Sequence, residues 1–251
     1  MEPVPDVETF RHLCRSSPWR WNSLRFEFTF RPADLDIGAE PLTVRAWVRR
    51  PGALRVEALD GALLACTPDI NASRDALYIS GRRKPWLLPP HLVTPVYDDG
   101  GLVARRPEAA YGEPAFGSGR FPAALDPVEL AGVRPVPSVE PRSNVAEIES
   151  PARVANGGRP AVEAVLTPNP AYVPYAVDAP LLYPGRTMVR VDAGTGVCVA
   201  SRALDGDLAG AGHELAILGV DEYMLDDLFE EVGMGLTDVR AHIPWELGPG
   251  A

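Results

Sequence analysis

Two early segments of the chain alternate strictly between apolar and polar residues. Residues 24–30, LRFEFTF, place an apolar side chain at every second position, and residues 42–50, LTVRAWVRR, repeat the pattern. Residues 53–59 continue it with Leu54, Val56 and Ala58. Successive side chains of a β-strand point to opposite faces, so a period of two is typical of a strand with one face buried. We therefore expect three strands that share an apolar face.

Tight turns link these expected strands. Pro51-Gly52 separates the second from the third, and Asp60-Gly61 follows the third. Such dipeptides between β-type runs are strong hairpin signals. Strands joined by short turns must be antiparallel neighbours, because parallel pairing needs a long crossover. The sequence thus predicts a meander, followed by shorter strands at residues 63–66 and 76–80.

The second half of the chain shows the same pattern of strands linked by tight turns. Strand patterns at residues 145–154 and 161–167 bracket Asn156-Gly157-Gly158, and residues 187–204 read as a hairpin around Gly194-Thr195-Gly196. Residues 213–220 form a further expected strand. Asp192 and Asp205 flank the 187–204 hairpin, and we interpret both as turn residues that bond nearby backbone.

Helical signals are few. Asp6 is a suitable N-cap for a helix over residues 6–14, whose apolar residues share one face. Residues 126–131 fit one helical turn, and residues 225–232 have helical apolar spacing within an acidic surround. We expect one domain spanning residues 1–251. Within it, residues 81–140 read as an irregular insertion-like segment and residues 243–251 as a tail.

Charge and composition exclude several classes of protein. The net charge is −10, and the imbalance lies beyond residue 106, where 9 Arg or Lys face 21 Asp or Glu. An acidic chain gains nothing from the counterion release that drives nucleic-acid binding, so no nucleic-acid partner is expected. There is no apolar run long enough for a membrane span and no leader-like N-terminus, so we expect a cytoplasmic protein. Only Lys84 accompanies 23 arginines, a composition typical of GC-rich genomes.

No catalytic or metal-binding motif emerges. The four histidines are scattered, and Cys14, Cys66 and Cys198 are too widely spaced for a Cys-x-x-Cys site. Gly117-Ser118-Gly119 lacks the strand and helix that would make it a nucleophile elbow. We therefore expect no enzyme activity, no cofactor and no metal.

Several short motifs resemble one superfamily. They are Arg50-Pro51, Arg55, Glu57 and Asp60-Gly61 in the early strands, Val191-Asp192 and Thr195-Gly196 later, and Leu228-Phe229 near the end. This set is similar to the LolA-type lipoprotein carriers, which include RseB/MucB-type periplasmic sensors and mycobacterial lipid-binding lipoproteins. The resemblance implies an α+β fold: a strongly curved antiparallel β-sheet, an unclosed half-barrel, with helices packed in its concave face. One departure is that Cys14 follows no apolar run, so it does not read as a lipidation site.

The resemblance also implies a function, namely non-enzymatic binding or sensing of a lipid or acyl ligand in the concavity. The expected ligand-binding residues are the inward-facing ones of the meander: Phe26, Phe28, Phe30, Val44, Val48, Leu54 and Val56. The alternative is a protein–protein interaction or regulatory module whose cavity is plugged by its own helices and takes no ligand. A protein partner would meet the outward row Arg45, Trp47 and Arg49, and the acidic stretch near residue 226 could meet this row in a second copy.

Overall fold

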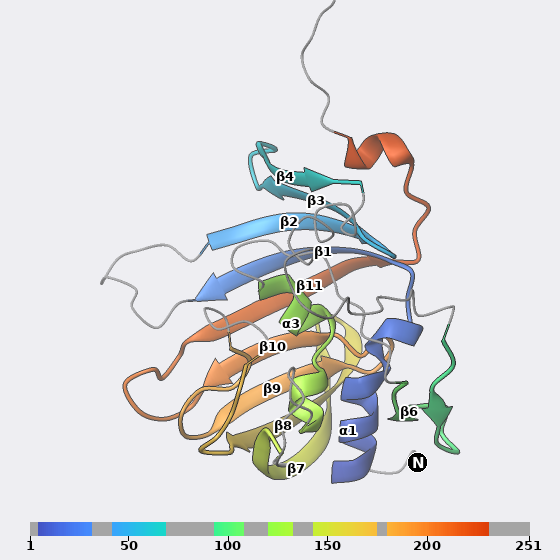
Figure 1. The fold of residues 1–251 in the computed structure, drawn as a ribbon. Coiled ribbons are helices and arrows are strands. Elements are labelled where there is room, and N and C mark those ends of the chain that lie inside the picture. The colour runs from blue at the N-terminus through green and yellow to red at the C-terminus, as the bar shows by residue number, and fades with distance from the viewer. Residues whose placement is uncertain are drawn as a thin grey trace, which may run out of the picture.

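One nine-stranded antiparallel sheet forms the body of the protein (Figure 1). The computed structural model describes residues 5–31, 42–68, 93–107, 120–132, 143–174 and 180–230. In space the strands run β4-β3-β2-β1-β11-β10-β9-β8-β7. Their bounds are β1 Ser23–Arg31, β2 Leu42–Arg49, β3 Ala53–Ala58, β4 Leu63–Thr67, β7 Val145–Asn156, β8 Arg159–Pro168, β9 Thr187–Asp192, β10 Cys198–Ala203 and β11 Gly212–Val220.

The expected meander is confirmed. β1 pairs with β2 in a register that sets Phe28 opposite Val44, and β2 pairs with β3 with Val48 opposite Leu54. Directly paired residues lie on the same face of a sheet, so the apolar residues of all three strands meet on one side. The hairpins β7–β8 and β9–β10 are confirmed as well, around the turns that their glycines predict.

The two halves of the chain join through β1 and β11, which are far apart in sequence. β11 runs antiparallel to β1 and sets Leu215 opposite Phe28. Within the described residues β4 and β7 are the outer strands and do not pair with each other, so the sheet curves without closing. The expected α+β fold, an open half-barrel with helices in its concavity, is therefore confirmed.

Two helices cover the concave face (Figure 1). α1, Val7–Ser16, begins at Asp6, whose side chain accepts a hydrogen bond from the Thr9 amide as an N-cap does. Its buried face, with Phe10 and Leu13, packs with residues of β7, β8 and β9. α3, Arg120–Leu125, packs over the meander. Short 3₁₀ turns follow each helix, η1 at Ser17–Trp19 and η3 at Val128–Ala131, and η4 at Asp226–Phe229 lies near the end of the described chain.

The remaining expectations have mixed outcomes. Residues 81–140 contain a small hairpin, β5 Val96–Tyr97 with β6 Val103–Arg105, and the helix α3, none of which the sequence pattern predicted. The expected strand at 76–80 and the tail at 243–251 lie outside the described residues. That the whole chain is one domain remains a prediction.

One close contact ties α1 to the sheet. Gly196, in the turn between β9 and β10, has φ +72°, and a Cβ there would lie 2.9 Å from the Ser17 amide nitrogen and 3.0 Å from the Leu13 carbonyl oxygen. Glycine adopts positive φ without strain, and here it also lets two backbones approach. The Thr195-Gly196 pair of the turn therefore allows the end of α1 to pack against the sheet.

We predict that Phe28→Ala lowers the free energy of unfolding by about 3–5 kcal/mol, because the ring is buried and its loss leaves a cavity. The matched control is Thr29→Ala on the opposite face, where a hydrogen bond to the Thr43 hydroxyl is lost at a cost of about 1 kcal/mol. Urea denaturation of both variants measures the difference. Equal losses would contradict this assignment of faces.

Candidate functional site

The structure brings all seven expected ligand-binding residues together. Phe26, Phe28 and Phe30 come from β1, Val44 and Val48 from β2, and Leu54 and Val56 from β3. All are buried, with exposed fractions between 0% and 8%. They form one continuous apolar surface on the concave side, because the period of two in each strand places them on the same face. Whether this surface binds a ligand remains a prediction.

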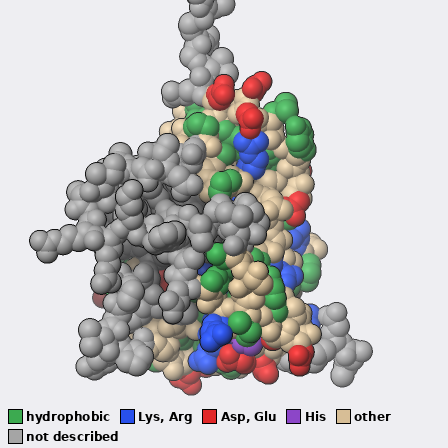
Figure 2. All heavy atoms as spheres, turned by 45° about the vertical axis from the view of Figure 1, so that its right-hand side comes forward, with side chains coloured by type: hydrophobic (Ala, Val, Ile, Leu, Met, Phe, Trp, Pro, Cys, Tyr) green, Lys and Arg blue, Asp and Glu red, His purple; other side chains and the backbone are tan. Residues whose placement is uncertain are grey.

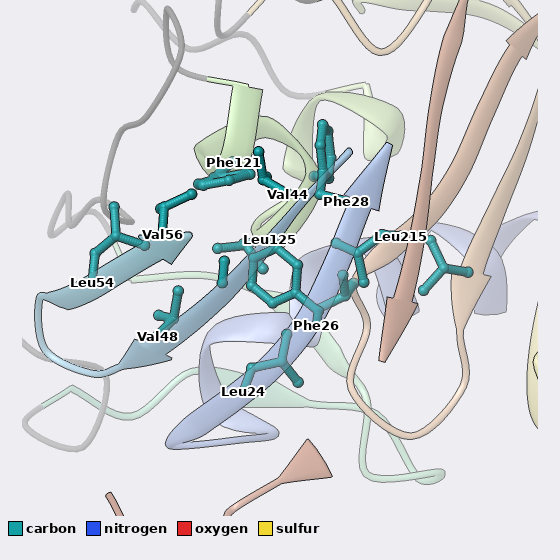
Figure 3. Packing of buried hydrophobic residues seen from close by; sticks show 14 of the residues in the cluster. Leu24, Phe26, Phe28, Val44, Val48, Leu54, Val56, Phe121, Leu125 and Leu215 are labelled. Atoms are coloured by element: carbon teal, nitrogen blue, oxygen red, sulfur yellow. The ribbon is translucent and has the colours of Figure 1, made fainter. Parts of the chain in front are cut away.

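The helix α3 covers this surface. The Phe121 ring meets Phe26 and Phe28 edge-on, with centroid distances of 5.4 and 5.2 Å, a favourable geometry for aromatic pairs. Figure 3 shows side chains of β1, β2 and β3 turned toward Phe121 and Leu125. The Leu125 carbonyl accepts a hydrogen bond from the Ser17 hydroxyl, which ties the end of α3 to η1. Among the described residues, a helix of only six residues therefore packs over the apolar face of β1, β2 and β3.

Sequence reasoning missed this helix. α3 reads RFPAAL, too short to show a helical period, and it lies in a Pro- and Gly-rich stretch. Phe121 was therefore absent from the expected site. The usable signal was compositional: Phe121, Ala123, Ala124 and Leu125 are a compact apolar group within a polar segment.

A neutral histidine borders the apolar surface. The His213 ring stacks on Phe28 at 5.1 Å with an interplanar angle of 13°, and its Nε2 lies 2.9 Å from the Cys198 carbonyl oxygen. Burial lowers the pKa of His213 to about 4, although the hydrogen bond to Cys198 works in the opposite direction. The ring is therefore uncharged at neutral pH, and Nε2 carries the hydrogen that it donates. His213 thus places an uncharged polar ring at the edge of the apolar surface formed by β1, β2 and β3.

Two pockets bounded by described residues lie elsewhere. One, of about 300 Å³, lies over β9, β10 and β11 and includes Arg31 and Arg202 in its lining. The other, of about 330 Å³, lies between Trp19, Arg20 and Tyr97. The seven expected residues line neither pocket.

The outward row Arg45, Trp47 and Arg49 lies on the convex face, as the alternation predicts. Arg45 forms an ion pair of 2.6 Å with Glu27 on the neighbouring strand. Arg49 donates to the Met224 carbonyl at 2.7 Å and to the Asp226 carboxylate at 2.6 Å. The acidic stretch thus meets the row of its own chain, in the place that a second copy was expected to take.

We call residues 221–229 the C-terminal strap. Its buried side chains Met224 and Phe229 pack with Ala53 and Trp47. Arg25 holds Glu222 through two hydrogen bonds of 2.8 and 2.9 Å, and Arg55 donates to the Leu228 carbonyl. Figure 2 shows the acidic side chains gathered over η4 at the top of the molecule, next to basic ones. The convex arginines therefore bind a peptide segment with carboxylates, carbonyls and an aromatic ring.

The turn aspartates have structural roles. Asp192 accepts hydrogen bonds from the Thr195 amide and hydroxyl at 2.7 and 2.8 Å and pairs with Arg159, which supports its interpretation as a turn residue. Burial alone would raise the pKa of Asp192, but the hydrogen bonds from Arg159 and Thr195 outweigh it and lower the pKa. The Asp205 carboxylate accepts hydrogen bonds from the guanidinium and the amide of Arg186, which immediately precedes β9, and these bonds lower the pKa of Asp205.

One histidine lies between two carboxylates but is fully engaged. His12 Nδ1 lies 2.6 Å from Asp98 and its Nε2 lies 3.0 Å from Glu8. Both ring nitrogens are thus occupied, which leaves neither for a substrate proton. Across the part of the chain that the structure describes, no group of three or more His, Cys, Asp or Glu residues could hold a metal ion.

Comparison with known proteins gives distant likenesses. No protein-family model and no curated protein matches the chain. Among solved structures, MucB is 14% identical over 90% of this chain, with a TM-score of 0.44, and this chain spans 62% of the MucB chain. A LolA-superfamily protein from Nitrosomonas europaea is 8% identical over 92% of this chain and 99% of its own, with a TM-score of 0.23.

Within the described ranges no helix is long and apolar enough to cross a membrane.

We predict that Arg49→Ala loosens the C-terminal strap. The variant loses charged hydrogen bonds to Met224 and Asp226 and a stacking contact with the Phe229 ring at 5.0 Å. A hydrogen bond to a charged group contributes about 1.5 kcal/mol, so hydrogen exchange at the Leu228 and Glu230 amides should accelerate about tenfold.

Arg45→Ala, four residues away on the same face of β2, is the matched control and should leave these exchange rates unchanged. Equal acceleration in both variants would mean that the strap responds to surface charge in general.

We predict that His213 makes the protein less stable in mild acid. Its pKa rises from about 4 in the folded chain to about 6.5 on unfolding, so between these values the unfolded state binds a proton that the folded state excludes. The free energy of unfolding should therefore fall by about 2 kcal/mol from His213 alone between pH 7 and pH 5.

His213→Gln should reduce this pH dependence by that amount, whatever its stability at pH 7. Chemical denaturation at both pH values tests this, and an NMR titration that places the folded pKa near 6.5 would contradict it.

Proposed function

We propose that this protein binds an acyl chain on its concave face, in the space that α3 occupies. The observation that carries the proposal is the packing of Phe121 against Phe26 and Phe28. Among the described residues, the short helix α3 packs over the apolar residues of the three strands. An acyl chain that took the place of the Phe121 ring would meet the same apolar surface.

The chemistry of this face favours an uncharged, elongated ligand. The inward side chains of β1, β2 and β3 are aliphatic or aromatic, and His213 at their border is neutral. A charged group would have to lose its hydration there without a counter-charge, which costs several kcal/mol. Each methylene removed from water instead contributes about 0.8 kcal/mol. The resemblance to lipoprotein carriers, whose concavity takes acyl chains, points to the same ligand class.

The test is a series of saturated fatty acids of increasing length, titrated against the full chain. We predict that affinity rises about fourfold for each added methylene until the concavity is full, as the transfer free energy per methylene requires. Phe121→Ala should strengthen binding, because the ligand no longer has to displace the ring.

Val44→Gln should weaken binding by placing an amide within the apolar surface. Val96→Gln, at an exposed position of the small β5–β6 hairpin, is the matched control and should have no effect. Affinity that is independent of chain length, with each variant folded, would reject the acyl-binding function.

The second candidate is a protein interaction module with a self-plugged concavity. The observation in its favour is that Arg49 and Arg55 bind backbone carbonyls of the C-terminal strap, as they would bind a partner peptide. This candidate would take precedence if the fatty acids fail to bind and a partner binds through Arg45, Trp47 and Arg49.

A further inference from the structure

The pocket over β9, β10 and β11 has a framework set by strand register. Gly212 of β11 pairs with Arg31 of β1 on one side and with Arg202 of β10 on the other. Paired residues share a face of the sheet, so the two arginines flank a position that has no side chain. A Cβ at Gly212 would lie 1.8 Å from the Ser201 carbonyl oxygen, so this position has no room for a larger residue. The result is a hollow with an arginine at either edge.

A third arginine and a second small residue complete the hollow. Ala200 pairs with Glu214 on one side and with Arg190 of β9 on the other. Its side chain adds only a methyl group to the floor. The turn between β7 and β8 contributes Asn156 and Gly157, and the pocket has a volume of about 300 Å³. We call this the arginine pocket, defined by Arg31, Arg190 and Arg202.

The hydrogen-bonding capacity of these arginines is only partly used. Arg190 Nε donates to Glu163 at 2.6 Å, and Arg31 Nη2 lies 3.4 Å from Glu214. The Arg31 Nε is buried and has no hydrogen-bond partner. The side chain of Arg202 has no hydrogen-bond or ion-pair partner in the described part of the chain. A buried donor without an acceptor costs free energy, which an anion in the pocket would recover.

The local charge is opposite to that of the whole protein. Three arginines and one glutamate, Glu214, line the pocket, in a chain with net charge −10. Arginine presents a planar fork of donors that matches the oxygens of phosphate. Here the donors come from three separate strands and so converge from different directions. The oxygens of a tetrahedral oxyanion point in several directions and can accept hydrogen bonds from all three arginines. A carboxylate has only two oxygens, and they lie in one plane.

We propose that the arginine pocket binds a phosphate monoester. The phosphate lies over Gly212 between Arg31 and Arg202, and Arg190 adds a third charged donor. The volume is at the lower end of the range for small-molecule sites, so the group attached to the phosphate is small. Met188, which pairs with Arg202, and Ala216 provide an apolar contact for it. This site lies apart from the seven residues of the proposed acyl site and does not depend on that function.

The test is calorimetric titration of the full chain with phenyl phosphate. We expect saturable binding to one site, weakened about tenfold by Arg202→Ala, which removes a charged donor at the edge of the hollow. Ala216→Leu, which narrows the pocket without a change of charge, should also weaken binding. Benzoate should bind less tightly than phenyl phosphate.

Arg105→Ala is the matched control, since it removes an exposed arginine on β6 that does not line the pocket. It should change the affinity by less than about twofold, as expected for a screened distant charge. The proposal is overturned if phenyl phosphate does not bind, if Arg202→Ala binds it as the parent does, or if Arg105→Ala weakens it equally.

A competition experiment distinguishes between two sources of the phosphate monoester, a lipid headgroup and a soluble ester. Phosphatidylcholine vesicles with and without phosphatidic acid are added to the complex with phenyl phosphate. Displacement only by the vesicles with phosphatidic acid assigns the pocket to a lipid headgroup. Retention of phenyl phosphate in both cases assigns it to a soluble phosphate ester.

Discussion

The structure depends on the covering of one apolar sheet face, to which the described residues contribute only a short helix and Trp21. β1, β2 and β3 turn every second side chain inward, and the resulting surface would be exposed without a cover. Phe121 contributes to that cover through its edge-on contacts with Phe26 and Phe28. Because α3 has only six residues, its position rests on these tertiary contacts more than on helix propensity. The acyl-binding proposal rests on this broad apolar face and on the short helix that packs against it among the described residues.

Glycines at two strand junctions set where elements can approach. Gly196 lets the β9–β10 turn lie against the end of α1, and Gly212 lets β11 lie against the Ser201 carbonyl of β10. Neither position has room for a side chain. The close approach at Gly196 brings α1 onto the concave face, whereas the missing side chain at Gly212 leaves a hollow on the convex face. The same kind of residue thus serves packing in one place and an open surface in the other.

Local patterns made most of the sheet predictable from the sequence. The period of two and the turn dipeptides are properties of neighbouring residues, so the meander and the two later hairpins could be read directly. The pairing of β1 with β11 could not, since it joins segments nearly 200 residues apart and depends on how the whole sheet curves. α3 could not be predicted, because six residues, one of them Pro122, are too few to show a helical period. The seven inward residues were found by alternation, but Phe121 and His213 reach the same surface from elements whose placement is a tertiary property.

The arginines show how tertiary context decides the meaning of a charge pattern. In the sequence, Arg45 and Arg49 look alike, four residues apart on one face of the same strand. In the structure Arg45 pairs with a neighbouring strand, whereas Arg49 holds the C-terminal strap. Local pairing in this way satisfies many of the described arginines, which is the usual state of charged groups near a protein surface. Arg31 and Arg202 differ because Gly212 between them has no side chain to offer, and Glu214 reaches Arg31 only at 3.4 Å. The excess of donors over acceptors at that point is a consequence of the strand register, and it makes the hollow suited to an anion.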